Sequence, residues 1–285
     1  MSTYTFDFDA LNPDRIACEA KFYGFGGRVK EPGCMAISIL ASLFGLFGLL
    51  ATSGACLSVY TYYSLMIAYC AFSAVYHATL HVGYYYMASL SNQILQSQII
   101  ILLLFALRVL PVISSNWILK ALGKLVLMLF TGYPIALILF AMSTTQIWVS
   151  WGGFDLLWIV VLLLLVAIFV ARKKFKAYHT SSSMFWLCLF ATISCALAYA
   201  FEVVDVWYCG WFAAFFRARG WFTFFLNLCF YYLITFCSFL YAHDLGFQVK
   251  TQQKPKRFPL FVTCDWDTKA VNDNAIHPIP YRHES

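Results

Sequence analysis

Charged residues are scarce in this sequence: they make up 11% of the 285 residues, against about 25% in a typical soluble protein. So few charges exclude an ordinary water-exposed surface. The net charge of +6 does not indicate nucleic-acid binding either, because the Lys and Arg residues lie between apolar runs, where they indicate membrane topology. We therefore expect an integral membrane protein that contacts membrane lipids and has no nucleic-acid partner.

Two further signals are missing. Residues 1–20 contain Asp7, Asp9 and Asp14 but no apolar run, so they do not resemble a secretory signal peptide, and we expect the first apolar run to direct insertion. The ten cysteines do not form the framework of a small disulfide-rich domain, because most of them lie inside apolar runs. There a cysteine behaves as a small hydrophobic side chain.

Apolar runs dominate the chain, and seven of them are long enough to cross a bilayer, which takes roughly 20 residues per helix. The runs are 35–56, 59–80, 93–113, 118–142, 147–171, 183–206 and 221–244. We predict an all-α fold, a seven-helix transmembrane bundle that occupies residues 35–244 as one domain. An extramembrane segment, residues 1–34, precedes it, and a polar tail, residues 245–285, follows.

The distribution of basic residues predicts the orientation. With the N-terminus outside, six Lys and Arg residues lie on the outer side and thirteen on the inner side. The positive-inside rule then favours an outer or lumenal N-terminus and a C-terminus on the cytosolic or matrix side. This topology places the end of the second run and the starts of the third and seventh runs at the outer face.

Histidines at the end of the second run are the clearest candidates for chemistry, since ionisable residues within membranes are costly. Ser73 and His77 are four residues apart and share a helix face. His77 and His81 have the same spacing, which suits two metal ligands. The alternative is that His77 hydrogen-bonds to a neighbouring helix while His81 lies at the membrane interface.

Several short motifs follow one another in the order found in a known family. They are Ser73-x-x-aromatic-His77-x-Thr79-Leu80, Cys18-Glu19 followed by Glu31, Asp205-x-x-x-Cys209, and the basic tail from Lys250 to Arg257. Together they resemble the alkaline ceramidases, which belong to a superfamily of seven-helix membrane hydrolases. The resemblance implies a location in the endoplasmic reticulum or Golgi.

The resemblance also implies which residues are missing. Family members hydrolyse ceramide with a zinc ion held by the helix-2 His and by a His-x-x-x-His pair near the start of helix 7. Ser73 and His77 match the helix-2 residues, but Ala218 and Phe222 stand at the helix-7 positions. Neither can bind zinc, so Ser73 and His77 are interpreted as vestigial.

The family's catalytic acid is missing as well, because Ala88 or Ser89 stands at the position of an Asp at the start of helix 3. His77 and His81 remain candidate metal ligands, but no third ligand is visible. We therefore expect no cofactor and no confident catalytic residue, and a protein that is not an enzyme.

Two features near the N-terminus are implied by the same resemblance. Glu19 and Glu31 match two positions of the family's calcium site, but Lys21 replaces its Asn, so we expect no calcium. The alternative is a pair of solvated surface carboxylates. Cys18 and Cys209 match the family's paired cysteines, which predicts a disulfide between them.

Other polar groups in the apolar runs are few. Asp155 lies in the fifth run, and Glu202 and Asp205 lie at the end of the sixth. We expect the last two to form ion pairs with Arg217, Arg219 or Lys21, which is a structural role and not a proton path.

The favoured hypothesis is a ceramidase-like membrane protein that has lost its zinc site and is an inactive structural or lipid-binding subunit of a larger membrane complex. Its partners would be membrane lipids and subunits that contact its tails. A complex subunit could also lie in the mitochondrial inner membrane. The alternative is an active alkaline ceramidase, or a related lipid amide hydrolase, with an altered metal site. An unrelated receptor or transporter is disfavoured, because the last run has no Lys for a retinal Schiff base.

Overall fold

The computed structural model describes part of the chain. The described ranges are residues 29–51, 57–106, 162–166, 181–208, 214–244, 248–254 and 261–267, with residue 210 and six single helical positions between 117 and 136. Five long helices account for most of them: α2 (Pro32–Ala51), α3 (Leu57–Thr79), α4 (Val82–Ala106), α7 (Ser181–Trp207) and α9 (Ala218–Asp244).

The helical character predicted from the apolar runs is confirmed in the described residues. Three helices are long and apolar enough to cross a membrane, with spans at Pro32–Leu50, Phe185–Asp205 and Ala218–Phe239. Helices α3 and α4 contain 23 and 25 residues, so they have the length of a span, but several tyrosines and glutamines lower their hydropathy. The predicted runs 118–142 and 147–171 lie largely outside the described residues.

Helix α4 begins earlier than predicted. Its first residue is Val82, eleven positions before the start of the run predicted at 93–113. Only Leu80 and His81 separate it from the end of α3. The prediction was wrong because tyrosine and serine lower the hydropathy of residues 84–92 without opposing a helix that buries them.

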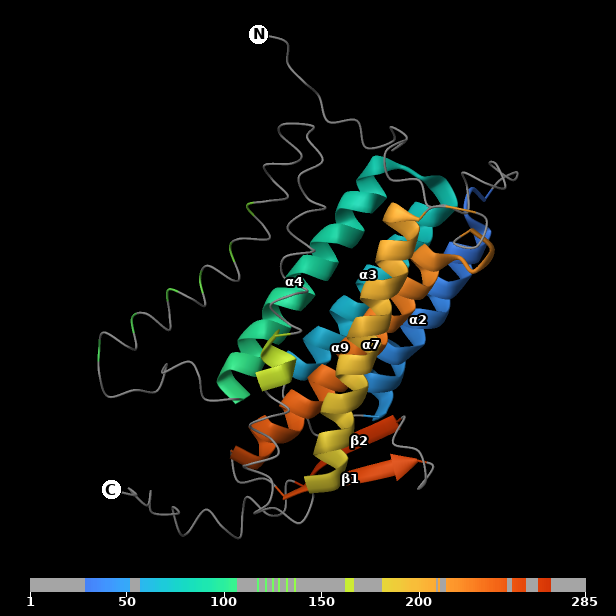
Figure 1. The fold of residues 1–285 in the computed structure, drawn as a ribbon. Coiled ribbons are helices and arrows are strands. Elements are labelled where there is room, and N and C mark those ends of the chain that lie inside the picture. The colour runs from blue at the N-terminus through green and yellow to red at the C-terminus, as the bar shows by residue number, and fades with distance from the viewer. Residues whose placement is uncertain are drawn as a thin grey trace, which may run out of the picture.

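The helices form one bundle of roughly aligned rods (Figure 1). The first residues of α2, α4 and α9 and the last residues of α3 and α7 lie at the same end, which is the upper end in Figure 1. We call it the site end. It unites the segments that the sequence analysis placed at the outer face.

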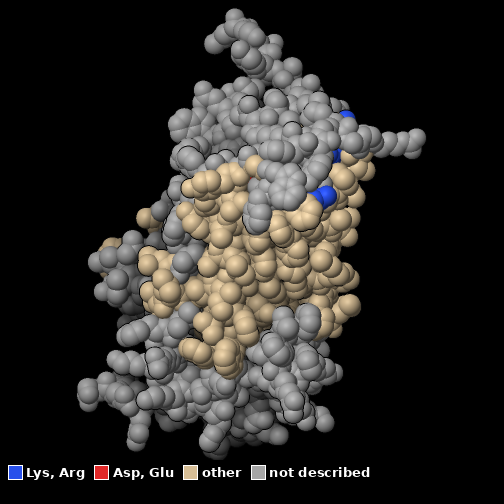
Figure 2. Space-filling view, turned by 45° about the vertical axis from the view of Figure 1, so that its right-hand side comes forward, with Lys and Arg blue, Asp and Glu red and all other residues tan. Residues whose placement is uncertain are grey.

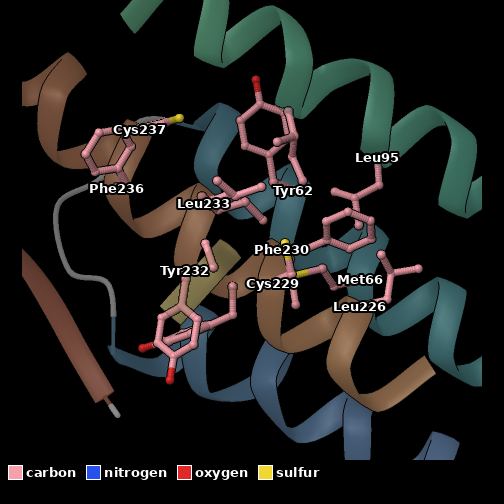
Figure 3. Close-up of a cluster of buried hydrophobic side chains, with 14 of the residues drawn as sticks. Tyr62, Met66, Leu95, Leu226, Cys229, Phe230, Tyr232, Leu233, Phe236 and Cys237 are labelled. Carbon is pink, nitrogen blue, oxygen red and sulfur yellow. The ribbon is translucent and has the colours of Figure 1, made fainter. Parts of the chain in front are cut away.

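Helix α9 is the central element. In its span 78% of the residues are buried, against 28% and 33% for the other two spans. A helix that is apolar all round suits a position surrounded by other helices. Its Leu226, Phe230 and Leu233 pack with Met66 of α3 and Leu95 of α4 in the core shown in Figure 3.

Small residues let α2 pack closely on α3. The buried face of α2 carries Cys34, Ser38 and Ala41, followed by Gly45 and Gly48. A Cβ on Gly45 would approach the backbone oxygen of Tyr63 to 3.0 Å, and one on Gly48 would overlap the ring of the same tyrosine. Since the ring is 2% exposed and its hydroxyl lies 3.1 Å from Thr235 Oγ1, it has little room to move. Such close backbone approach is typical of helix pairs in membranes.

Gly48→Ala is expected to destabilise the bundle by about 1–3 kcal/mol, because the new methyl group overpacks the α2–α3 contact. Gly132→Ala is the matched control, since a Cβ at this helical position has no atom within 4 Å. The midpoint of detergent-induced unfolding measures both. Equal midpoints for the two variants would contradict the close α2–α3 contact.

The charges of the helices are concentrated at the site end. Among the described residues of α2, α3, α4, α7, α9 and their flanks, the only Lys and Arg are Lys30, Arg217 and Arg219. Figure 2 shows a broad band of uncharged residues, with basic groups only near its upper edge. Large apolar side chains such as Leu43 and Leu50 of α2 and Ile193 of α7 are exposed. This surface suits lipid or apolar partner helices.

A two-stranded antiparallel sheet lies at the opposite end of the bundle (Figure 1). Strand β1 (Gln248–Lys254) pairs with β2 (Phe261–Asp267), with Thr251 opposite Cys264. These strands were not predicted, because the tail was expected to be only a polar segment. Both strands approach α9, and β2 also approaches α2.

Candidate functional site

The site end is built around the start of α2. Pro32 is the first helical residue, where its missing N–H costs no hydrogen bond and its fixed φ favours the helix. The two preceding residues run along the end of α3. The Lys30 N–H donates to the carbonyl of Ala78 at 3.2 Å, and the Glu31 N–H donates to the carbonyl of His77 at 2.9 Å. These bonds satisfy carbonyls at the end of α3 that have no partner within the helix.

The same contact brings a carboxylate to an imidazole. Oε2 of Glu31 lies 2.6 Å from Nδ1 of His77, and the two side chains are 0% and 3% exposed. The expectation of a solvated carboxylate is therefore wrong for Glu31, because the turn before Pro32 directs it into the bundle. The alternative in which His77 hydrogen-bonds to a neighbouring helix is close to what the structure shows, since its partner Glu31 lies one residue before α2.

Cys34 is the third member of the cluster. One ligand atom from each of Glu31, Cys34 and His77 lies within 4.8 Å of the others, and all three residues are buried. The first turn of α9 covers the cysteine, since a Cβ on Gly220 would lie 3.2 Å from the Cys34 Cα. The sequence analysis did not single out Cys34. Its position three residues after Glu31 was the available signal, but using it required knowing that the helix begins at Pro32.

A pair of serines lies one helical turn further into the bundle. Oγ of Ser73 is 3.3 Å from Oγ of Ser38, and both residues are buried. Ser73 precedes His77 by four residues on α3, so the prediction that they share a helix face is confirmed. The hydroxyl has a second hydroxyl beside it, which is not a general base.

His81 does not share that face. Helix α3 ends at Thr79, and Leu80 has a φ of 60°, in the left-handed region that a leucine rarely adopts. The chain therefore turns before His81, whose ring stacks on Tyr84 with centroids 6.4 Å apart. The prediction that His77 and His81 lie on one face is wrong, because four-residue spacing places side chains together only while the helix continues.

Arg219 of α9 forms the predicted ion pairs at the site end. Its guanidinium nitrogens lie 3.8 Å from a carboxylate oxygen of Glu202 and 4.0 Å from one of Asp205, both on α7. The three side chains are 16%, 19% and 8% exposed. Arg217 donates to the carbonyls of Phe215 at 2.6 Å and of Ala214 at 3.4 Å.

Helix α9 also approaches α3. Thr223 of α9 contacts Tyr69 of α3. Ala218 packs instead with Phe201 of α7. Ala218 and Phe222, which the resemblance placed at the helix-7 ligand positions, lie on α9, and neither side chain has an atom that binds a metal.

Other predicted features lie outside the described residues. They are Cys18, Glu19, Lys21, Asp155 and Cys209, so the predicted Cys18–Cys209 disulfide and the Glu19 half of the calcium site stay predictions. Ala88, one of the two residues that the resemblance placed at the acid position, is buried in the apolar core.

Comparison of the chain with known protein families and with curated proteins finds no match. The protein is therefore classified by its fold and its site alone. This is a helical membrane protein with a buried Glu–Cys–His cluster and an Arg–carboxylate cluster at one end of its bundle.

Proposed function

We propose that this protein is a seven-helix, ceramidase-like membrane protein without the family's zinc site, which serves as a structural or lipid-binding subunit of a membrane complex. One observation carries the proposal. At the site end, α9 presents the guanidinium of Arg219, which pairs with Glu202 and Asp205 of α7. A cation at this position repels a metal ion, whereas an imidazole would bind one.

The outer surface supports the binding part of the proposal. Exposed apolar side chains lie on α2 and α7, and the described face in Figure 2 carries a wide uncharged band. Such a surface needs acyl chains or apolar helices as neighbours. We place the site end on the outer or lumenal side, in accord with the distribution of basic residues.

A second candidate function is an active lipid amide hydrolase with an altered metal site. The observation that favours it is the cluster of Glu31, Cys34 and His77, which lies on the same stretch of α2 and α3 as Ser73. Three protein ligands with one open position is the usual arrangement of a catalytic zinc. Ceramide hydrolysis separates the two functions.

The full-length protein in liposomes is expected to release no fatty acid from ceramide at alkaline pH above the rate in empty liposomes, with or without added zinc. The reason is that no zinc-bound water of lowered pKa is formed at the family's site. Fatty-acid release measured by mass spectrometry tests this. His77→Ala is the matched variant, and turnover in the parent that this variant abolishes would establish the hydrolase.

The lipid-binding part has its own measurement. Mild detergent extraction is expected to co-purify lipid with the bundle, and stripping that lipid is expected to lower the unfolding midpoint. Lipid analysis of the purified protein reports the first quantity. A protein that keeps its midpoint after complete delipidation contradicts the lipid-binding role.

A further inference from the structure

We propose that Glu31, Cys34 and His77 bind a Zn²⁺ ion that ties the start of α2 to the end of α3. This site differs from the one implied by the ceramidase resemblance, because two of its three ligands come from the α2 side of the contact. The proposal concerns metal binding alone and goes beyond the proposed function, which it does not require.

The donor set selects the metal. A thiolate, an imidazole and a carboxylate together are typical of zinc sites, whereas calcium and magnesium take oxygen ligands. The charge also balances, since one thiolate and one carboxylate neutralise a divalent cation. A neutral complex is favoured at a position where the three residues are at most 3% exposed.

The distances fit with small movements. Zinc bonds of about 2.0–2.3 Å place the ligand atoms of a tetrahedral site roughly 3.3–3.8 Å apart. The three candidate atoms lie within 4.8 Å of one another, and the 2.6 Å Glu31–His77 contact would open slightly to admit the ion.

The surrounding structure holds the ligands in place. Cys34 lies in the first turn of α2 beneath Gly220, and the Glu31 N–H is bonded to the carbonyl of His77 itself. The side chains that would bind the ion are therefore carried by helix ends that are already joined through their backbones. Preorganisation of this kind lowers the entropic cost of binding a metal.

Metal analysis of the full-length protein in detergent micelles tests the proposal. We expect about one zinc per chain in the parent protein, and at least a roughly tenfold loss of occupancy in Cys34→Ser. Cys188→Ser is the matched control. Cys188 is also fully buried but lies on α7, away from the proposed ligands, so this variant should keep the zinc. Zinc well below stoichiometry in the parent, or equal zinc in the two variants, overturns the site and leaves a hydrogen-bonded cluster only.

Cobalt binding to the parent protein gives a spectroscopic test that does not depend on the folding of any variant. Titration of the metal-free parent with Co²⁺ is expected to produce a thiolate-to-cobalt charge-transfer band and the strong visible bands of a four-coordinate ion. A parent protein that shows neither band contradicts the proposal, even where Cys34→Ser fails to fold. Because no substrate is present, these results do not depend on the ceramide assay.

Discussion

Replacing His77 with phenylalanine is expected to lower the unfolding free energy by about 3–5 kcal/mol, because the change removes the imidazole that lies beside a buried carboxylate. Glu31 is 0% exposed and its Oε2 lies 2.6 Å from His77 Nδ1, so no solvent is available to replace the imidazole. SDS-induced unfolding in mixed micelles with a chelator present measures this loss for the metal-free protein.

A control variant and a double variant make the measurement specific. His81→Phe makes the same chemical change beyond the end of α3 and should cost less than about 1 kcal/mol. The double variant Glu31→Leu with His77→Phe should lose about 2 kcal/mol less than the sum of the single variants, because it removes both members of the contact together. Additive losses would show that the two side chains are not coupled.

Arg219→Met is the second change with a large expected effect, a loss of about 3 kcal/mol. It removes the cation that lies between Glu202 and Asp205, which are 19% and 8% exposed, and so leaves two like charges close together in a mostly apolar setting. The same SDS titration measures the loss.

Rescue distinguishes charge from packing. Adding Glu202→Gln and Asp205→Asn to Arg219→Met should recover at least about half of the lost free energy, since the carboxylates no longer repel one another. Arg217→Met is the control, because the Arg217 guanidinium donates to a backbone carbonyl, and its loss should cost less than about 1.5 kcal/mol. A lack of rescue would assign the effect of Arg219 to its aliphatic stem.

Helix positions followed from the apolar runs because long stretches of apolar residues have few alternatives to a helix in a membrane. The runs 183–206 and 221–244 lie within α7 and α9 to within three residues at each end. The early start of α4 was missed because its first turns are rich in tyrosine, which hydropathy scores poorly although the bundle buries Tyr86. The β1–β2 pairing was missed because β1 is mostly polar and contains no apolar run that would predict a strand.

The candidate site was only partly predictable. Ser73 and His77 stood out because their spacing lies inside one uninterrupted helix, and the pairing of Glu202 and Asp205 with Arg219 followed from opposite charges near two helix ends. Cys34 could not be joined to His77 from sequence, since 43 positions separate them and only the packing of α2 on α3 brings them together. The helix face of His81 was predicted wrongly because Leu80 is neither a glycine nor an asparagine, the residue types that usually indicate a left-handed backbone.

The join between α2 and α3 has a consequence for how this bundle can diverge. At the site end, the backbone N–H groups of Lys30 and Glu31 donate hydrogen bonds to the backbone carbonyls of Ala78 and His77. Every residue type except proline offers the same N–H, so substitutions at these positions leave the register of the two segments intact. During evolution these side chains could therefore be replaced, and their chemistry changed or lost, while the backbone geometry at the ends of the two helices is retained.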